Sequence, residues 1–199
     1  MTRRPQVRGK GRRVGGLVTL LLVVAAPAVA HPGHETSGFV HPFTGIDHML
    51  AMVGVGLWAS LLAVRKPSMA WLVPAIFLVM MAIGAAAGFG GIKLPLVEAV
   101  ILASVFLIGG LIIGAVRVPA VWAIGLAGLF AAFHGYAHAL EAPASEAGGY
   151  ILGFLLATAL LQGLGVALGW VVRRLVGDIG VRALGGAIFA AGAVALITH

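Results

Sequence analysis

The sequence lacks cysteine and contains few charged side chains. Only 10% of its 199 residues are charged, whereas 61% are hydrophobic. A soluble domain carries roughly 25% charged residues, and a chain of this length has no interior large enough to bury so much apolar surface. The absence of cysteine excludes disulfides, thiolate-ligated zinc or iron–sulfur sites and a thiol nucleophile. We therefore expect an all-α, polytopic membrane protein in contact with lipid.

Acidic residues are also scarce, which gives a net charge of +7. Six of the 13 basic residues lie within the first thirteen positions, so the rest of the chain has seven basic residues against six acids, a net charge of about +1. A nucleic-acid partner is therefore not expected.

The first thirty residues have the pattern of a cleavable signal peptide. A basic stretch precedes an apolar run from Val14 to Ala26, and Ala28-Val29-Ala30 supplies the small residues before a cleavage point. The mature chain would then begin at His31. The alternative is an uncleaved first helix, and either arrangement leaves His31 outside the cytoplasm.

The remaining residues, 31–199, form a single predicted transmembrane domain. A helix needs about 20 predominantly apolar residues to cross a bilayer, and charged or loop residues divide this region into six such segments. The segments are 44–64, 69–88, 94–116, 119–141, 147–172 and 180–198. Four glycine pairs with a spacing of four are candidate helix contacts: Gly84 and Gly88, Gly110 and Gly114, Gly149 and Gly153, Gly165 and Gly169.

Basic residues are distributed unevenly over the loops. With the mature N-terminus outside, the cytoplasmic side holds Arg65, Lys66, Arg117, Arg173, Arg174 and Arg182, whereas the outer loops hold only Lys93. Cytoplasmic loops are enriched in Lys and Arg. We therefore expect both termini outside and a multi-pass protein of the bacterial inner (plasma) membrane.

Ionisable residues in the predicted segments are concentrated at the outer, periplasmic face. Each costs about 2.5–3.5 kcal/mol in the bilayer centre and needs a partner or a purpose. We predict that they form a metal site facing the periplasm. The candidate ligands are His41, Asp47, His48, Glu98, His134, His138 and Glu141.

Three of these candidates share one face of a helix. Counting from His134, His138 and Glu141 follow by four and seven residues, which correspond to offsets of about 40° and −20° at 100° per residue. The alternative for the two histidines is a hydrogen-bonded packing pair. Asp47 also has an alternative role, because Thr44 and Asp47 match a helix capping box. Gln162 is a candidate for a hydrogen bond between helices.

Imidazole and carboxylate ligands without thiolate suit nickel, cobalt or zinc as divalent ions. Ligand type alone does not choose among the three metals. His31 and His34 form a candidate capture arm at the exposed terminus, with a plain linker as the alternative.

Two stretches resemble the signatures of the HupE/UreJ family. They are His41-Pro-Phe-Thr-Gly-Ile-Asp-His48 and Phe133-His-Gly-Tyr-Ala-His-Ala-Leu-Glu141, and the similarity extends to Leu94-Pro-Leu-Val-Glu98. The resemblance implies a nickel, sometimes cobalt, permease that supplies hydrogenase or urease maturation. The resemblance implies that the metal is bound by His41, Asp47, His48, Glu98, His138 and Glu141. His134 lies in the second stretch, with His138 and Glu141.

The expected function is therefore secondary uptake of a divalent metal, nickel first and cobalt second, from the periplasm to the cytoplasm. The protein would hold no permanent cofactor and catalyse no reaction. Its expected partners are the metal ion, the lipid bilayer and a downstream metallochaperone, and a homo-oligomer is compatible with six short spans.

The main alternative is an intramembrane zinc hydrolase, and a haem-binding subunit is a second one. The scarcity of polar residues in the inner halves of the first, third and fourth segments is the main objection to a transport path.

Overall fold

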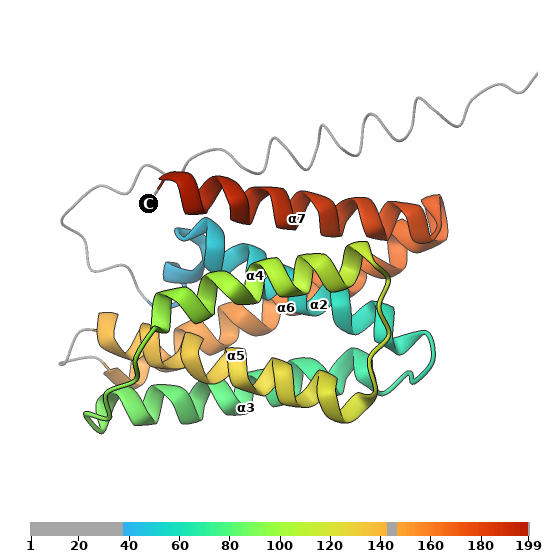
Figure 1. Cartoon of the computed structure of the whole chain (residues 1–199). Coiled ribbons are helices and arrows are strands. Elements are labelled where there is room, and N and C mark those ends of the chain that lie inside the picture. The colour runs from blue at the N-terminus through green and yellow to red at the C-terminus, as the bar shows by residue number, and fades with distance from the viewer. Residues whose placement is uncertain (1–37, 143–146, 199) are drawn as a thin grey trace, which may run out of the picture. The chain divides into compact units, whose positions relative to one another are not determined.

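The computed structural model describes residues 38–142 and 147–198, and these residues form helices without any strand. The predicted signal peptide and the candidate capture arm, His31 and His34, lie outside the described residues. The described residues form six α-helices preceded by one 3-10 turn, and Figure 1 shows their arrangement. Their bounds are η1 His41–Phe43, α2 Ile46–Ala63, α3 Met69–Phe89, α4 Val97–Ile113, α5 Ala120–Glu141, α6 Ala147–Val176 and α7 Asp178–Thr198.

These α-helices coincide with the six predicted segments, and residues unsuited to helices separate them. Pro119 is the N-cap of α5. Gly177 separates α6 from α7 with a φ of 85°, a conformation that glycine adopts without steric cost. Its N–H donates to the Arg173 carbonyl at 2.9 Å and so closes the last turn of α6.

Three of the helices, α3, α5 and α6, are long and apolar enough to cross a membrane. The apolar stretches His48–Ala63 and Val97–Ile113 are shorter. The all-helical architecture is thus confirmed, whereas the six-span arrangement stays a prediction.

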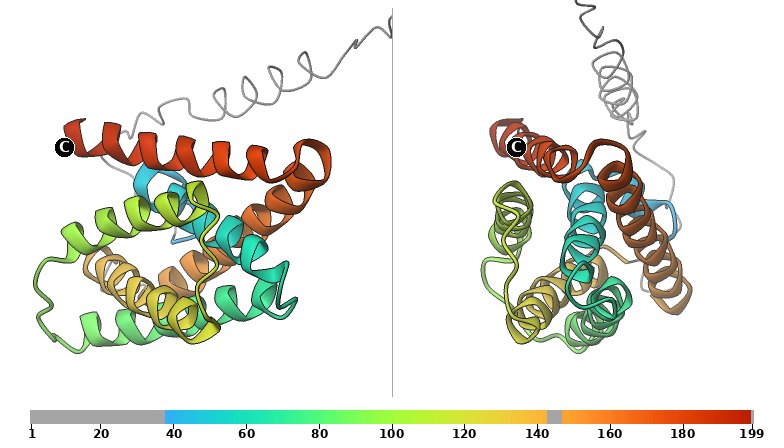
Figure 2. Two further views of the ribbon diagram at one scale, coloured as in Figure 1. Left: turned by 45° about the vertical axis from the view of Figure 1, so that its right-hand side comes forward. Right: turned by 90° about the vertical axis from the view of Figure 1, so that its right-hand side faces the viewer.

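Helix α2 lies in the middle of the bundle. In the end-on view of Figure 2 the other five α-helices surround it. Every residue from Ala51 to Leu62 except Val53 is buried. The most extensive contacts are those of α3 with α5, of α2 with α6 and of α4 with α7. A helix that is apolar on all sides is expected at such a position.

Two of the four predicted glycine pairs do mediate close helix contacts. A β-carbon on Gly84 would collide with the Ala132 carbonyl of α5, and one on Gly165 would collide with the Val53 carbonyl of α2. Their partners Gly88 and Gly169 face the same two helices. The other two pairs were predicted wrongly, because an added β-carbon on Gly110 or Gly149 would meet no atom of the described residues within 4 Å.

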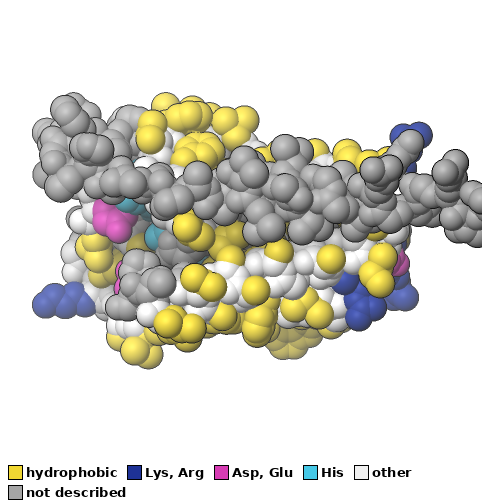
Figure 3. Space-filling view, turned by 90° about the horizontal axis from the view of Figure 1, so that it is seen from above, with side chains coloured by type: hydrophobic (Ala, Val, Ile, Leu, Met, Phe, Trp, Pro, Cys, Tyr) yellow, Lys and Arg dark blue, Asp and Glu magenta, His cyan; other side chains and the backbone are white. Residues whose placement is uncertain are grey.

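Successive helices run in opposite directions, so the starts of α2, α4 and α6 lie at one end of the bundle (Figure 1). We call this the histidine end, because η1 and the last turn of α5 lie there. Among the residues that the structure describes, most Lys and Arg side chains gather at the opposite, basic end, as Figure 3 shows. At the basic end, Arg173 Nη2 and Asp178 Oδ1 form an ion pair at 2.8 Å. The uneven distribution of basic residues over the loops in the sequence therefore appears in the structure as a difference in basic charge between the two ends of the bundle.

Candidate metal site

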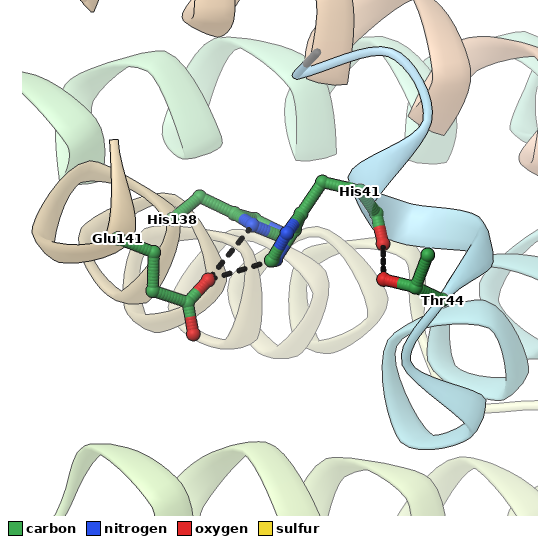
Figure 4. A network of polar contacts seen from close by, with 4 residues as sticks. All are labelled: His41, Thr44, His138 and Glu141. Atoms are coloured by element: carbon green, nitrogen blue, oxygen red, sulfur yellow. Dashed lines mark hydrogen bonds and ion pairs between the residues drawn. The ribbon is translucent and has the colours of Figure 1, made fainter. Parts of the chain in front are cut away.

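The candidate site joins η1 to the last turn of α5 at the histidine end. Nε2 of His41 lies 2.8 Å from Oε2 of Glu141, and Nδ1 of His138 lies 3.7 Å from the same oxygen (Figure 4). Residues about one hundred positions apart in the sequence thus share one carboxylate oxygen.

These three residues, which we call the three-ligand group, could hold a metal ion. One ligand atom from each of His41, His138 and Glu141 lies within 4.8 Å of the other two. Two imidazole nitrogens and a carboxylate oxygen form a common ligand set for divalent transition metals, with a fourth position open to water. Bond lengths of about 2.0–2.2 Å would require only a modest contraction of the group.

The exposure of the three side chains differs strongly. The Glu141 side chain is 47% exposed and that of His41 is 22% exposed, whereas His138 is fully buried at 0%. The three-ligand group therefore extends from the surface into the interior.

The turn before α2 holds His41 in place. The Thr44 hydroxyl donates to the His41 carbonyl at 2.7 Å, and the Thr44 N–H donates to the same oxygen at 3.0 Å. The N-cap of α2 is Gly45, with no side-chain cap. The prediction of Thr44 as a cap was therefore wrong, because its hydroxyl closes the preceding 3-10 turn instead.

Asp47 belongs to the first turn of α2, but its side chain is outside what the structure describes. Its predicted role as a ligand stays a prediction.

Four imidazole rings form a continuous series that begins at the partly exposed His41 and ends at the buried His134. The ring centres of His41 and His138 are 5.0 Å apart, those of His138 and His48 4.8 Å, and those of His48 and His134 5.5 Å. His134 is fully buried and lies about 6 Å deeper than His138, one helical turn earlier in α5. The structure thus brings four of the predicted histidines together, and two of them, His41 and His138, contact Glu141.

The orientation of His134 is fixed by its own helix. Its Nδ1 donates a hydrogen bond to the Phe130 carbonyl at 3.0 Å, because a carbonyl oxygen can only accept. In the neutral ring Nε2 is then the basic nitrogen. Imidazole ligands are commonly oriented by a hydrogen bond from their second nitrogen in this way.

Comparisons with known proteins agree with the two sequence signatures. The family model described as HupE / UreJ protein matches residues 19–195. The chain belongs to the HupE/UreJ family. Protein HupE from Rhizobium leguminosarum bv. viciae is 39% identical over 188 residues, which cover 91% of this chain and 97% of that protein. No solved structure matches the chain.

Glu98, from the third stretch that resembles the HupE/UreJ family, lies outside the three-ligand group and outside the series of imidazole rings. It lies in the first turn of α4 and is exposed. Because α4 begins at the histidine end, Glu98 shares that end of the bundle, as predicted, without joining the group.

Sequence reasoning missed two aromatic residues of α6 that line the site. The Phe154 ring stacks on His138, with ring centres 4.8 Å apart and an interplanar angle of 25°. The Tyr150 ring lies 5.8 Å from that of His41. Their spacing of four residues places both on one side of α6, but aromatic residues are too common in membrane helices for this spacing to have singled them out.

Proposed function

We propose that this HupE/UreJ protein takes up a divalent transition-metal ion, nickel first and cobalt second, from the periplasm into the cytoplasm. The observation that carries the proposal is the three-ligand group of His41, His138 and Glu141 at the histidine end. Its nitrogen and oxygen donors, with no thiolate, match the preferences of these ions.

The graded exposure of the site suits capture from solution. A hydrated ion meets the exposed carboxylate of Glu141 first and then exchanges water for imidazole. His138 is buried, and its contacts with His48 and, through His48, with His134 continue the series of nitrogen donors inward. Ligand exchange along such a series avoids a fully dehydrated intermediate in a medium of low dielectric constant.

The membrane potential is a sufficient driving force. Moving two charges through 100 mV is worth about 4.6 kcal/mol, more than a thousandfold in concentration ratio. We therefore propose secondary transport without a nucleotide, an enzymatic step or a permanent cofactor. Both Asp47 and Glu98 would contribute negative charge near the entrance.

The proposed topology has six spans, with both termini and the three-ligand group on the periplasmic side of the inner membrane. The accumulation of basic residues at the other end of the bundle supports this orientation. Residues 1–30 would act as a signal peptide and 31–199 as the transport domain, with His31 and His34 as a capture arm. The metal would pass to a metallochaperone and on to hydrogenase or urease maturation, and the protein could work as a homo-oligomer.

The test is accumulation of radiolabelled nickel in cells that lack their own importers, with cobalt and zinc as competitors. Wild type is compared with Asp47→Asn and His138→Ala at equal membrane abundance. We expect accumulation by wild type and its loss in both variants. Background accumulation by a correctly inserted wild type would disprove uptake.

The second candidate is an intramembrane zinc hydrolase, which the same donor set favours. Two histidines and one glutamate also hold catalytic zinc and leave a position for an activated water. Release of products from labelled lipids by the purified, zinc-loaded protein, abolished by Glu141→Gln, would establish hydrolysis in place of transport.

A further inference from the structure

The buried side of α6 carries polar residues below the three-ligand group. Tyr150, Phe154, Thr158 and Gln162 follow one another at a spacing of four residues and are all buried. Such a spacing forms a continuous ridge along a helix. The ridge begins beside His41 and His138, which contact Tyr150 and Phe154.

The depth of the lower two residues follows from helix geometry. At 1.5 Å per residue, Thr158 lies about 6 Å and Gln162 about 12 Å beyond Phe154 along α6. The backbone of Gln162 packs directly on α2, because a β-carbon on Gly56 would collide with the Gln162 carbonyl. Helix contact thus holds Gln162 firmly in the interior of the bundle.

Both polar side chains are fully buried at 0% exposure. The Thr158 Oγ1 atom and both the Oε1 and Nε2 atoms of Gln162 have no hydrogen-bond partner among the described residues. The predicted interhelical hydrogen bond of Gln162 is thus not found there. Buried polar groups without partners are costly, above all in a membrane, where no solvent can compensate them.

Two buried serine hydroxyls of the bundle are satisfied locally, whereas the buried Tyr150 hydroxyl, on the same side of α6 as Thr158, has no hydrogen-bond partner among the described residues. Ser60 Oγ donates to the Leu57 carbonyl and Ser104 Oγ to the Ile101 carbonyl, both at 2.6 Å. Thr158 makes no such bond to its own helix, although threonine can bond to the preceding turn. Its hydroxyl therefore differs from those of the two serines in having no structural role in its helix.

We propose that Thr158 and Gln162 form an inner binding site for the partly hydrated divalent ion in transit, an inference that rests on the proposed function. The hydroxyl and the amide offer oxygen atoms to the ion and hydrogen-bonding groups to its remaining waters. Neither residue carries a charge, so the inner site binds a dication more weakly than the carboxylate-containing group above it. Conduction requires sites that an ion can leave as well as enter.

This site also answers the objection raised by the sequence. The inner halves of the first, third and fourth predicted segments contain almost no polar residue, and the inner site belongs to the fifth. Counted from the level of His138 and Phe154, Thr158 lies about one turn deeper, at the depth of His134, and Gln162 about two turns deeper, so that α6 offers an oxygen donor beside and one beyond the end of the imidazole series.

The experiment combines nickel uptake with nickel binding. Thr158→Val and Gln162→Met remove the polar atoms and keep a similar size, and apolar replacements are suited to a membrane helix. Thr158→Ser keeps the hydroxyl, and Ser104→Ala is the matched control for a buried hydroxyl that is satisfied locally. Initial uptake rates are measured in cells at equal membrane abundance, and the Kd for nickel is measured on the purified full chain.

We expect Thr158→Val and Gln162→Met each to lower the maximal uptake rate by about 10- to 100-fold, as for loss of a hydrogen bond to a charged species. Their nickel Kd should stay unchanged, because the three-ligand group is intact. Thr158→Ser and Ser104→Ala should transport like wild type.

Wild-type uptake rates in Thr158→Val and Gln162→Met would overturn the inner site while leaving the proposed function intact. A parallel loss of nickel binding would overturn it too, because it would indicate a structural role for these side chains. A wild type that binds nickel but transports none would overturn the proposed function, and the inner site with it.

Discussion

Replacing Glu141 by Gln should weaken nickel binding strongly, because it removes the only charge of the three-ligand group and keeps an oxygen ligand. Atoms within 4.8 Å of one another leave the centre of the group at most 4.8 Å divided by √3, about 2.8 Å, from the carboxylate oxygen. At that distance a dication and a carboxylate attract by about 3 kcal/mol even at the dielectric constant of water. This screened value is appropriate because the Glu141 side chain is 47% exposed.

A loss of about 3 kcal/mol corresponds to a Kd roughly 150-fold higher. Isothermal titration of the purified protein with nickel chloride measures this change directly. Asp178→Asn is the matched control, because it neutralises a carboxylate that pairs with Arg173 at the opposite end of the bundle. A Kd for Glu141→Gln within a few-fold of the wild-type value would show that this carboxylate does not bind the ion.

Three further predictions test the entrance, the packing and the topology. Glu98→Gln should reduce uptake at low nickel concentration and leave the Kd of the purified protein unchanged, because the exposed carboxylate attracts ions without joining the three-ligand group. Gly84→Ala should lower the thermal midpoint of unfolding by several degrees, since overpacking costs about 1–3 kcal/mol. Gly125→Ala should not lower it, because a β-carbon on Gly125 would meet no described residue within 4 Å. The chain has no cysteine, so an impermeant maleimide should label Lys93→Cys in intact cells and Arg117→Cys only after permeabilisation; the reverse pattern would invert the topology.

The helices could be predicted from the sequence because the signal is strong and local. Apolar runs of about 20 residues, interrupted by residues such as Pro119 and Gly177, define helix bounds without knowledge of the packing. The approach of His41 to Glu141 was also foreseeable, because alternating helix directions bring the start of α2 and the end of α5 to one face. Position along the membrane normal is thus encoded in the order of the segments.

Lateral position is not encoded in this way, so the sequence could not show which side chains at one depth lie against each other. Glu98 shares the depth of the site, but the rotation of α4 leaves it exposed. The glycine spacing of four is the same at Gly84, which meets α5, and at Gly110, where an added β-carbon would meet no described residue within 4 Å. Which helix lies beside which depends on the summed packing of whole faces, and no single motif contains this information.

The central position of α2 also bears on how the protein is made. Helix α2 is the first of the described α-helices to be synthesised, yet it packs extensively against α6, with Gly56 against the backbone of Gln162. Helices α3, α4 and α5 must therefore be synthesised before this partner becomes available. Long-range pairing of this kind slows folding and exposes unfinished surfaces in the meantime. A nascent chain that stops before α6 leaves α2 incompletely covered, so the histidine end of the bundle can mature only after most of the polypeptide has been translated.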